Sequence, residues 1–201
     1  MRYNTSMNYY ISDLHFNHKN IIGFDNRPYS TVKEMEDALI TNWNSVVKEG
    51  DTVYHLGDFC WGKADEWERL LKLLNGNKVI IQGNHDLSKY PPSVKRLLTD
   101  IKEYKEIKDG GMNVILSHFP IMAYKHSYDP NTFMLYGHVH VTKEAAWIKR
   151  WTKELRNNRT STYDNRGQLI NVGCMMPYMN YTPQTLAYLI DKLDKGETLY
   201  A

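Results

Sequence analysis

Cysteine is scarce in this sequence, and long apolar runs are absent. Only Cys60 and Cys174 occur among 201 residues, so a disulfide framework is not expected and the composition fits a reducing cytosol. No apolar run approaches the ~20 residues that a membrane-spanning helix requires. Residues Met1 to Tyr10 are polar and lack the apolar core of a signal peptide. We therefore expect a cytoplasmic protein that makes no membrane contact.

An excess of charge of one sign is also lacking. Lysine and arginine number 25 against 23 aspartate and glutamate, which gives a formal net charge of +2. This balance does not by itself indicate binding to nucleic acid. The chain is long enough to bury a core without disulfides and contains no repeat or long linker, so we predict a single domain over residues 1–201.

The sequence instead contains several short apolar runs. Each of them ends near a residue of a type that binds metals. Short runs rich in β-branched and aromatic residues and bounded by glycine are typical of buried strands. The runs span residues 9–12, 52–56, 79–81, 114–117 and 133–136, and they lead into Asp13, Asp58, Asn84, His118 and His138. In parallel sheets, functional groups gather beyond the carboxyl ends of the strands. We therefore expect these polar side chains to meet in space.

Helices are predicted between these strands. Thr31 can cap a helix that Gly50 ends, with Glu34 closing a capping box. A second helix is predicted over residues 65–75, and residues 169–173 and 185–190 are predicted to be two further strands. Alternating strands and helices favour an α/β protein with largely parallel strands, in which a second sheet packs on the first.

The residue types at the strand ends suit divalent cations. Carboxylate, amide oxygen and imidazole ligands admit manganese, iron, zinc or nickel. The predicted ligands are Asp13, His15, Asp58, Asn84, His118, His138 and His140. Gly57, Gly83 and Gly137 each precede a ligand directly, where a tight turn or a close approach of two backbones is expected.

Five blocks of sequence together resemble a known family. Asp13-Leu14-His15, Gly57-Asp58, Gly83-Asn84-His85-Asp86, Ser117-His118-Phe119-Pro120 and Gly137-His138-Val139-His140 are similar, in order, to the signature of the calcineurin-like metallophosphoesterases. The resemblance spans residues 13–140 of the chain. It implies an αββα sandwich of two packed mixed sheets flanked by helices, and a centre of two metal ions, with manganese favoured.

The resemblance also implies a role for each matching residue. One metal would be held by Asp13, His15, Asp58 and His140, and the other by Asp58, Asn84, His118 and His138, so that Asp58 bridges them. A water shared by the metals would attack phosphorus. His85 would protonate the leaving oxygen as general acid, and Asp86 would orient His85.

One departure from the family narrows the expected substrate. The protein phosphatase branch continues its Gly-Asp block with Asp-Arg-Gly, whereas this chain reads Gly57-Asp58-Phe59-Cys60. This difference disfavours phosphoproteins as substrates. The sequence around Asp58 is more similar to that of small bacterial and phage phosphoesterases. We expect a small phosphorylated substrate, such as a nucleotide or a cyclic nucleotide phosphodiester. The alternatives are a metal-dependent nuclease acting on polynucleotide and a non-catalytic scaffold of the same fold.

Four further residues have both a functional and a structural interpretation. Arg27 could clamp a phosphate, although a surface salt bridge is favoured. His18 could touch substrate, although packing or surface exposure is favoured, and for His126 the two interpretations are balanced. His55 lies inside an apolar run and is predicted to be a core histidine.

The segment over residues 143–168 is locally basic and carries Trp147 and Trp151 one helical turn apart. It could form a cap that guides a nucleotide or nucleic acid by charge and stacking. A surface helix whose two tryptophans pack on the core is the favoured interpretation.

Overall fold

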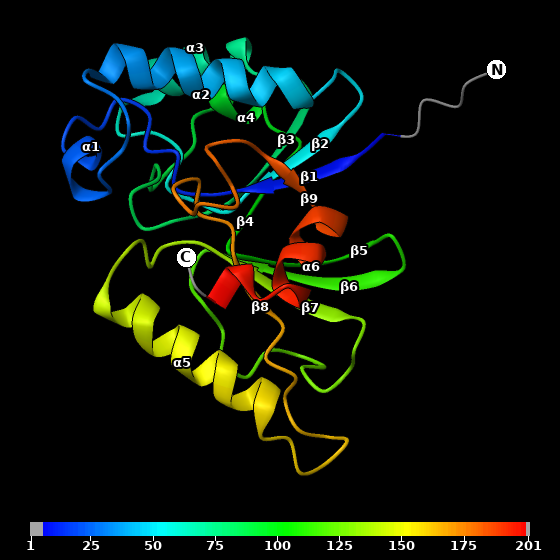
Figure 1. Ribbon diagram of the computed structural model, residues 1–201. Helices are drawn as coiled ribbons and strands as arrows, with labels where there is room; N and C mark the ends of the chain where they lie inside the picture. Colours follow the sequence, from blue (N-terminus) through cyan, green and yellow to red (C-terminus); the bar gives the residue numbers. More distant parts are fainter. Residues whose placement is uncertain (1–5, 200–201) are drawn as a thin grey trace.

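Two β-sheets form the centre of the protein (Figure 1). The computed structural model describes residues 6–199; the ends of the predicted domain, residues 1–5 and 200–201, lie outside this range, as does the first half of the polar segment Met1 to Tyr10. The first sheet has the order β4-β3-β2-β1-β9, with β4 (Asp100–Lys102), β3 (Asn77–Ile81), β2 (Thr52–His55), β1 (Asn8–Ile11) and β9 (Gln184–Thr185). The second has the order β5-β6-β7-β8, with β5 (Tyr104–Asp109), β6 (Met112–Ser117), β7 (Thr132–Tyr136) and β8 (Leu169–Asn171).

Helices cover the outer faces of the two sheets. Figure 1 shows α2 (Val32–Val46), α3 (Ala64–Leu73) and α4 (Pro92–Lys95) on the side of the first sheet, and α5 (Lys143–Asn157) on the side of the second. The remaining helical elements are α1 (Ile21–Phe24), α6 (Leu186–Asp194) and a 3₁₀ turn, η1 (Glu197–Leu199). Pairing is parallel except at β9 and β5, each of which runs antiparallel to its neighbour. The predicted α/β sandwich of two mixed sheets is confirmed.

Strands β6 and β7 of the second sheet are buried on both faces, and their residues alternate between two apolar clusters. Val114 and Leu116 belong to the large cluster, which also contains Ile11 of the first sheet and so lies between the sheets. Ile115 points the other way and packs in the smaller cluster with Ile148 of α5. The period of two in an extended strand explains this division. It fixes α5 against the sheet that carries two of the predicted ligand loops.

The sequence predictions of individual elements are confirmed in part. Helix α2 begins after Thr31, whose side chain accepts a hydrogen bond from the Glu34 amide, but it ends at Val46 rather than at Gly50. The buried Val47 adopts an extended conformation there. Strands β4 and β5 were not predicted, because both are rich in charged residues and β4 has only three residues.

The prediction of a strand over residues 185–190 is wrong. Only Gln184 and Thr185 pair with β1, and residues Leu186 to Asp194 form helix α6. Leu186, Leu189 and Leu193 recur at helical spacing and are buried, and the Thr185 hydroxyl accepts a hydrogen bond from the Tyr188 amide as an N-cap. The cap and the spacing outweigh the strand propensity of the short apolar run.

The two sheets are joined near the carboxyl ends of β1 and β8. The Ser12 amide donates to the Val172 carbonyl at 2.8 Å, and the Cys174 amide donates to the Ser12 carbonyl at 2.9 Å. Ser12 directly precedes Asp13. This junction therefore places the loop after β1 against the ligand-bearing end of the second sheet.

His55 is a core histidine, as predicted. It is fully buried at the end of β2, and its ring lies edge-on to Phe59 with ring centroids 5.3 Å apart. Burial, and then the neighbouring His118, lowers the pKa of His55 to about 3. The folded protein therefore holds this imidazole neutral at pH values where an unfolded chain would protonate it.

This buried imidazole predicts a loss of stability in acid. The pKa of His55 in the folded state lies below its unfolded value of 6.5, so its stability contribution is present above pH 6.5 and is lost as the pH falls toward 3. The expected slope is about 1.4 kcal/mol per pH unit. Urea unfolding of wild type and His55→Leu between pH 7 and pH 4.5 measures it. The variant should lose less stability per pH unit than wild type, and parallel losses would contradict the account.

Candidate metal centre

The structure brings predicted ligands from both sheets into one cluster. Asp13 and His15 follow β1, Asp58 follows β2, His118 follows β6 and His140 follows β7. The ligand atoms of Asp13, His15 and His140 all lie within 4.8 Å of one another, and so do those of Asp13, Asp58 and His118. The two groups share Asp13, so they adjoin each other.

Short distances between nitrogen and oxygen atoms define the two groups. In the first, the Nε2 atoms of His15 and His140 lie 3.3 Å apart, and His140 Nε2 lies 3.8 Å from Asp13 Oδ1. In the second, His118 Nε2 lies 3.0 Å from Asn84 Oδ1 and 3.7 Å from Asp58 Oδ2. Asn84, predicted as a ligand, therefore reaches the second group through its amide oxygen.

Asp58 contacts both groups through one oxygen atom. Its Oδ2 lies 3.6 Å from His15 Nε2 and 3.7 Å from His118 Nε2, while its Oδ1 accepts a hydrogen bond from the His85 amide. Asp13 also belongs to both groups, but its carboxylate accepts hydrogen bonds from the Ser12 hydroxyl and the His138 amide. The Oδ2 atom of Asp58 is thus the better placed of the two to lie between two cations.

His138 lies at the edge of the cluster. Its ring packs against the rings of His118 and Phe119, with centroids 5.0 Å and 4.5 Å away. Within residues 6–199, its ring nitrogens are not part of either group of ligand atoms. The role of His138 as a metal ligand stays a prediction. The short distances between ligand atoms involve the other six predicted ligands.

Backbone strain is concentrated at the ligands. Asp13, His15, Asp58, His138 and His140 all have positive φ angles, between 31° and 72°. Residues other than glycine rarely adopt this conformation, and each instance costs about 1–3 kcal/mol. Such strain persists where the surrounding structure fixes the chain, and it turns successive polar side chains inward at each strand end.

Two glycines allow the ligand loops to touch. A Cβ atom at Gly57, which has φ of +86°, would lie 2.5 Å from His118 Nδ1 and 2.6 Å from the Gly83 nitrogen. A Cβ atom at Gly83 would collide with Asp58 Oδ1 and the Asp58 nitrogen. The close backbone approach predicted from the sequence is therefore present at both positions.

Hydrogen bonds orient two of the imidazoles. His118 Nδ1 lies 2.7 Å from the Leu56 carbonyl, and His140 Nδ1 lies 2.8 Å from Asp25 Oδ1. Because both partners are acceptors, we assign the proton to Nδ1 in each ring, which leaves the Nε2 lone pair facing the cluster. This is the usual arrangement of metal-binding histidines. Asp25 was not predicted, because its contact with His140 spans 115 residues of sequence.

The position of Arg27 matches neither a phosphate clamp nor a surface salt bridge, the two interpretations that the sequence allowed. Its side chain is 0% exposed, and it pairs with Asp25 at 2.9 Å, so the salt bridge is buried rather than on the surface. The guanidinium also donates to the carbonyls of Asp13 and Leu14, both at 2.8 Å. Arg27 therefore holds the loop that carries Asp13 and His15, and in this position it does not face a substrate phosphate.

Asp86 also differs from its predicted role of orienting His85. Its carboxylate accepts hydrogen bonds from the amides of Asp58, Phe59 and Gly83 at 2.8–3.1 Å. These contacts join the loop after β2 to the loop after β3. Burial raises the pKa of Asp86 to about 6, against the opposing effect of these amide donors. Asp86 is thus a positioning residue for the ligand loops.

The exposed His85 and the half-buried His18 form an aromatic border with Trp61. The ring of His85 lies 5.9 Å from that of His15 and 4.9 Å from that of Trp61. His18 stacks on Trp61 at 4.4 Å and lies 5.4 Å from His15. Both histidines therefore border the centre, as a general acid and a substrate contact would require. Trp61 was not predicted, since its place depends on the turn after Cys60.

His126 lies apart from this border. Its ring is exposed and contacts Tyr128, with centroids 6.0 Å apart. With Lys125 and Glu106 it lines a separate pocket beside β5.

The donor set fits cations at the centre. Burial, followed by the charges of His140 and Arg27, lowers the pKa of His15, so that its imidazole is neutral. Burial raises the pKa of Asp58, in opposition to the nearby His118. Imidazole nitrogens and two buried carboxylates are ligands that divalent cations require, and a bound cation would stabilise both carboxylates as anions.

Comparison with known proteins places this geometry in a family. The domain model of the calcineurin-like phosphoesterase superfamily matches residues 9–193. An uncharacterised protein of Methanocaldococcus jannaschii, MJ1445, is 34% identical over 196 residues, covering 95% of this chain and 93% of the relative. Gene 66 protein of Mycobacterium phage L5 is 28% identical over 162 residues, covering 67% of this chain and 78% of that protein.

A solved structure is similar over the same length. The protein of unknown function AQ665 from Aquifex aeolicus is 32% identical, with a TM-score of 0.66, and the match covers 94% of this chain and 100% of that one. The chain belongs to the calcineurin-like phosphoesterase superfamily. Among the described residues, no helix is both long and apolar enough to cross a membrane.

The Asp25–His140 contact predicts an effect on metal affinity. Asp25→Asn keeps the shape of the side chain but removes the charge that supports His140, so manganese should bind about 10–100-fold more weakly. Isothermal titration of the metal-free protein with manganese measures this change. Asp37→Asn, which alters an exposed carboxylate paired with Lys33, should leave the affinity unchanged. An unchanged affinity in Asp25→Asn would show that this contact does not support a ligand.

Proposed function

We propose that this protein is a dinuclear metal-dependent phosphoesterase that acts on small phosphorylated molecules. The proposal rests chiefly on Asp58. Its Oδ2 atom lies 3.6–3.7 Å from an imidazole nitrogen of each of the two groups. A bridging carboxylate is the feature that holds two cations about 3.5–4 Å apart. Membership of the phosphoesterase superfamily supports the same conclusion.

The proposed assignment of ligands builds on the two groups and adds His138, which the family resemblance implies. Asp13, His15, Asp58 and His140 would hold one cation, and Asp58, Asn84, His118 and His138 the other. Bound cations would neutralise phosphate charge and supply an activated water as nucleophile. The mixed oxygen and nitrogen ligands suit manganese, which we propose as the working metal, and also admit iron, zinc or nickel.

Residues of the chain itself would donate the proton that the leaving group requires. His85 is exposed beside the centre, and its backbone amide is fixed on Asp58 Oδ1 at 2.9 Å. We propose that its imidazolium protonates the leaving oxygen. His18, stacked on Trp61, would contact the ester group from the same side.

A nucleotide or cyclic nucleotide phosphodiester is the proposed kind of substrate. The polynucleotide alternative gains little support from α5, because Glu144 and Glu154 accompany Arg150 on the surface that faces the centre's neighbouring cavity. The formal net charge of +2 also does not favour a polyanionic substrate.

Removal of the general acid should reduce the rate without releasing metal. Hydrolysis of bis-p-nitrophenyl phosphate with manganese should fall by about 10²–10⁴-fold in His85→Ala, while metal content stays at the wild-type value. His126→Ala is the matched control and should keep its rate, because His126 contacts Tyr128 instead. A silent His85→Ala variant would refute the acid assignment.

Removal of the bridge should affect both metals. Asp58→Asn should bring the manganese content after desalting from about two ions per chain to fewer than one, measured by elemental analysis. Asp37→Asn again serves as the control. Loss of a single ion, with the other retained at full occupancy, would show that Asp58 does not bridge.

A further inference from the structure

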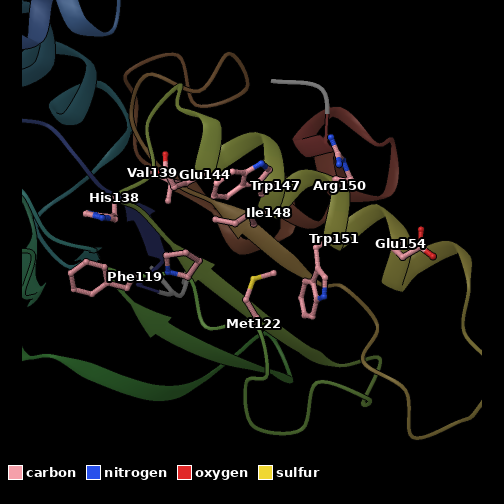
Figure 2. Close-up of a pocket in the computed structure, with 11 residues that line it drawn as sticks. Phe119, Met122, His138, Val139, Glu144, Trp147, Ile148, Arg150, Trp151 and Glu154 are labelled. Carbon is pink, nitrogen blue, oxygen red and sulfur yellow. The ribbon is translucent and has the colours of Figure 1, made fainter.

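A cavity of about 990 Å³ opens directly beside the metal centre. It lies between the loop after β6 and helix α5 (Figure 2). Its walls include Phe119, Met122, His138, Trp147, Ile148 and Trp151. The volume is at the upper end of the range typical of pockets for small organic ligands.

The cavity adjoins the centre at His138. That residue lines the cavity, and its ring also packs against His118 with centroids 5.0 Å apart. Phe119 stands beside it, with its ring 4.5 Å from that of His138. Figure 2 shows His138 and Phe119 at one end of the lining and Arg150, Trp151 and Glu154 toward the other. A molecule whose phosphate is at the metals can therefore extend into the cavity.

The wall formed by α5 is held in place from behind. Ala145 and Ile148 pack into the smaller apolar cluster against Ile115 and Met134 of the sheet. The Thr142 hydroxyl caps the helix by accepting from the Ala145 amide. Trp151 packs against the same cluster, which confirms the predicted packing for this tryptophan. The cavity is therefore a fixed feature of the fold.

The other tryptophan does not follow the predicted packing. Trp147 is 62% exposed, and Phe119 across the cavity is 49% exposed. Large aromatic rings left in contact with water gain free energy when a ligand covers them, and flat ligands stack on them well. The charged groups of the lining are Glu144, Arg150 and Glu154, so carboxylates outnumber cations and the cavity does not suit a phosphate.

From this arrangement we propose that the cavity binds a flat aromatic group attached to the phosphate that the metals hold. This inference rests on the proposed function and adds its substrate class, namely phosphoesters that carry an aromatic ring system such as a nucleobase. Phe119 and Trp147 supply the exposed aromatic surface that would contact the ring, and Trp151 also lines the cavity. These residues determine specificity and leave the hydrolytic chemistry to the centre.

Two phosphonates with the same head group separate ring binding from phosphate binding. Methylphosphonate and 1-naphthylmethylphosphonate resist hydrolysis, and isothermal titration of the manganese-loaded protein measures the affinity for each. The naphthyl compound should bind at least about tenfold more tightly to wild type, because its ring is taken out of water. In the double variant Phe119→Ala/Trp147→Ala this preference should shrink to about twofold or less. Tyr163→Ala, which removes a 79% exposed ring outside the cavity lining, should keep it.

Distinct results would overturn the inference. Equal binding of the two phosphonates to wild type would refute the aromatic site while leaving the proposed function intact. If octylphosphonate bound as tightly as the naphthyl compound, the cavity would be a site for alkyl chains. Dimers in sedimentation velocity that the double variant abolishes would assign this surface to a second copy of the chain. Failure of both phosphonates to bind manganese-loaded protein would refute the phosphate site and this inference together.

Discussion

The placement of two buried carboxylates among several imidazoles is the constraint on which the rest of the structure depends. Asp13 and Asp58 are 0% and 2% exposed, and the nearest side-chain nitrogens belong to histidines. Burying unpaired carboxylates costs several kcal/mol each. Bound cations offset that cost and turn an unfavourable cluster into a functional one. Metal binding should accordingly contribute to the stability of the folded chain.

Much of the surrounding architecture serves to keep this cluster rigid. The two sheets meet at Ser12, immediately before Asp13. Arg27 holds the carbonyls of the first ligand loop, and Asp86 joins the second and third. These buried contacts supply the fixed surroundings in which five ligands keep positive φ angles. Preorganised ligands of this kind bind metal without a large reordering of the chain.

Local patterns in the sequence were sufficient for part of this picture. The apolar runs before Asp13, Asp58 and His118 predicted strands and placed their polar ends at the carboxyl ends of parallel strands. That these strands belong to two sheets, which meet at Ser12, was not evident from the runs themselves. The run at Leu186 was misread as a strand, since a short apolar segment has no distinctive period. The positions of the Asp25, Arg27 and Asp86 side chains depend on contacts between distant segments of the chain. Neither spacing nor composition carries that information, and the same limit applies to Trp147 and the cavity beside His138.

Two neighbouring regions of the structure would each contact a different part of the proposed substrate. The loops of both sheets form the centre that would hold phosphate, whereas α5 and the loop after β6 form the apolar wall next to it. His138 belongs to both regions, because its ring packs on His118 and lines the cavity. Changes in α5 can therefore alter which ester group is accepted while the ligands stay as they are.

The central claim, that two metal ions share one carboxylate bridge, is tested most directly by electron paramagnetic resonance of the manganese-loaded protein. Two manganese ions about 3.5–4 Å apart and joined by Asp58 should give the spectrum of a spin-coupled pair once two equivalents have been added. A spectrum of isolated, uncoupled manganese at saturation would contradict the account.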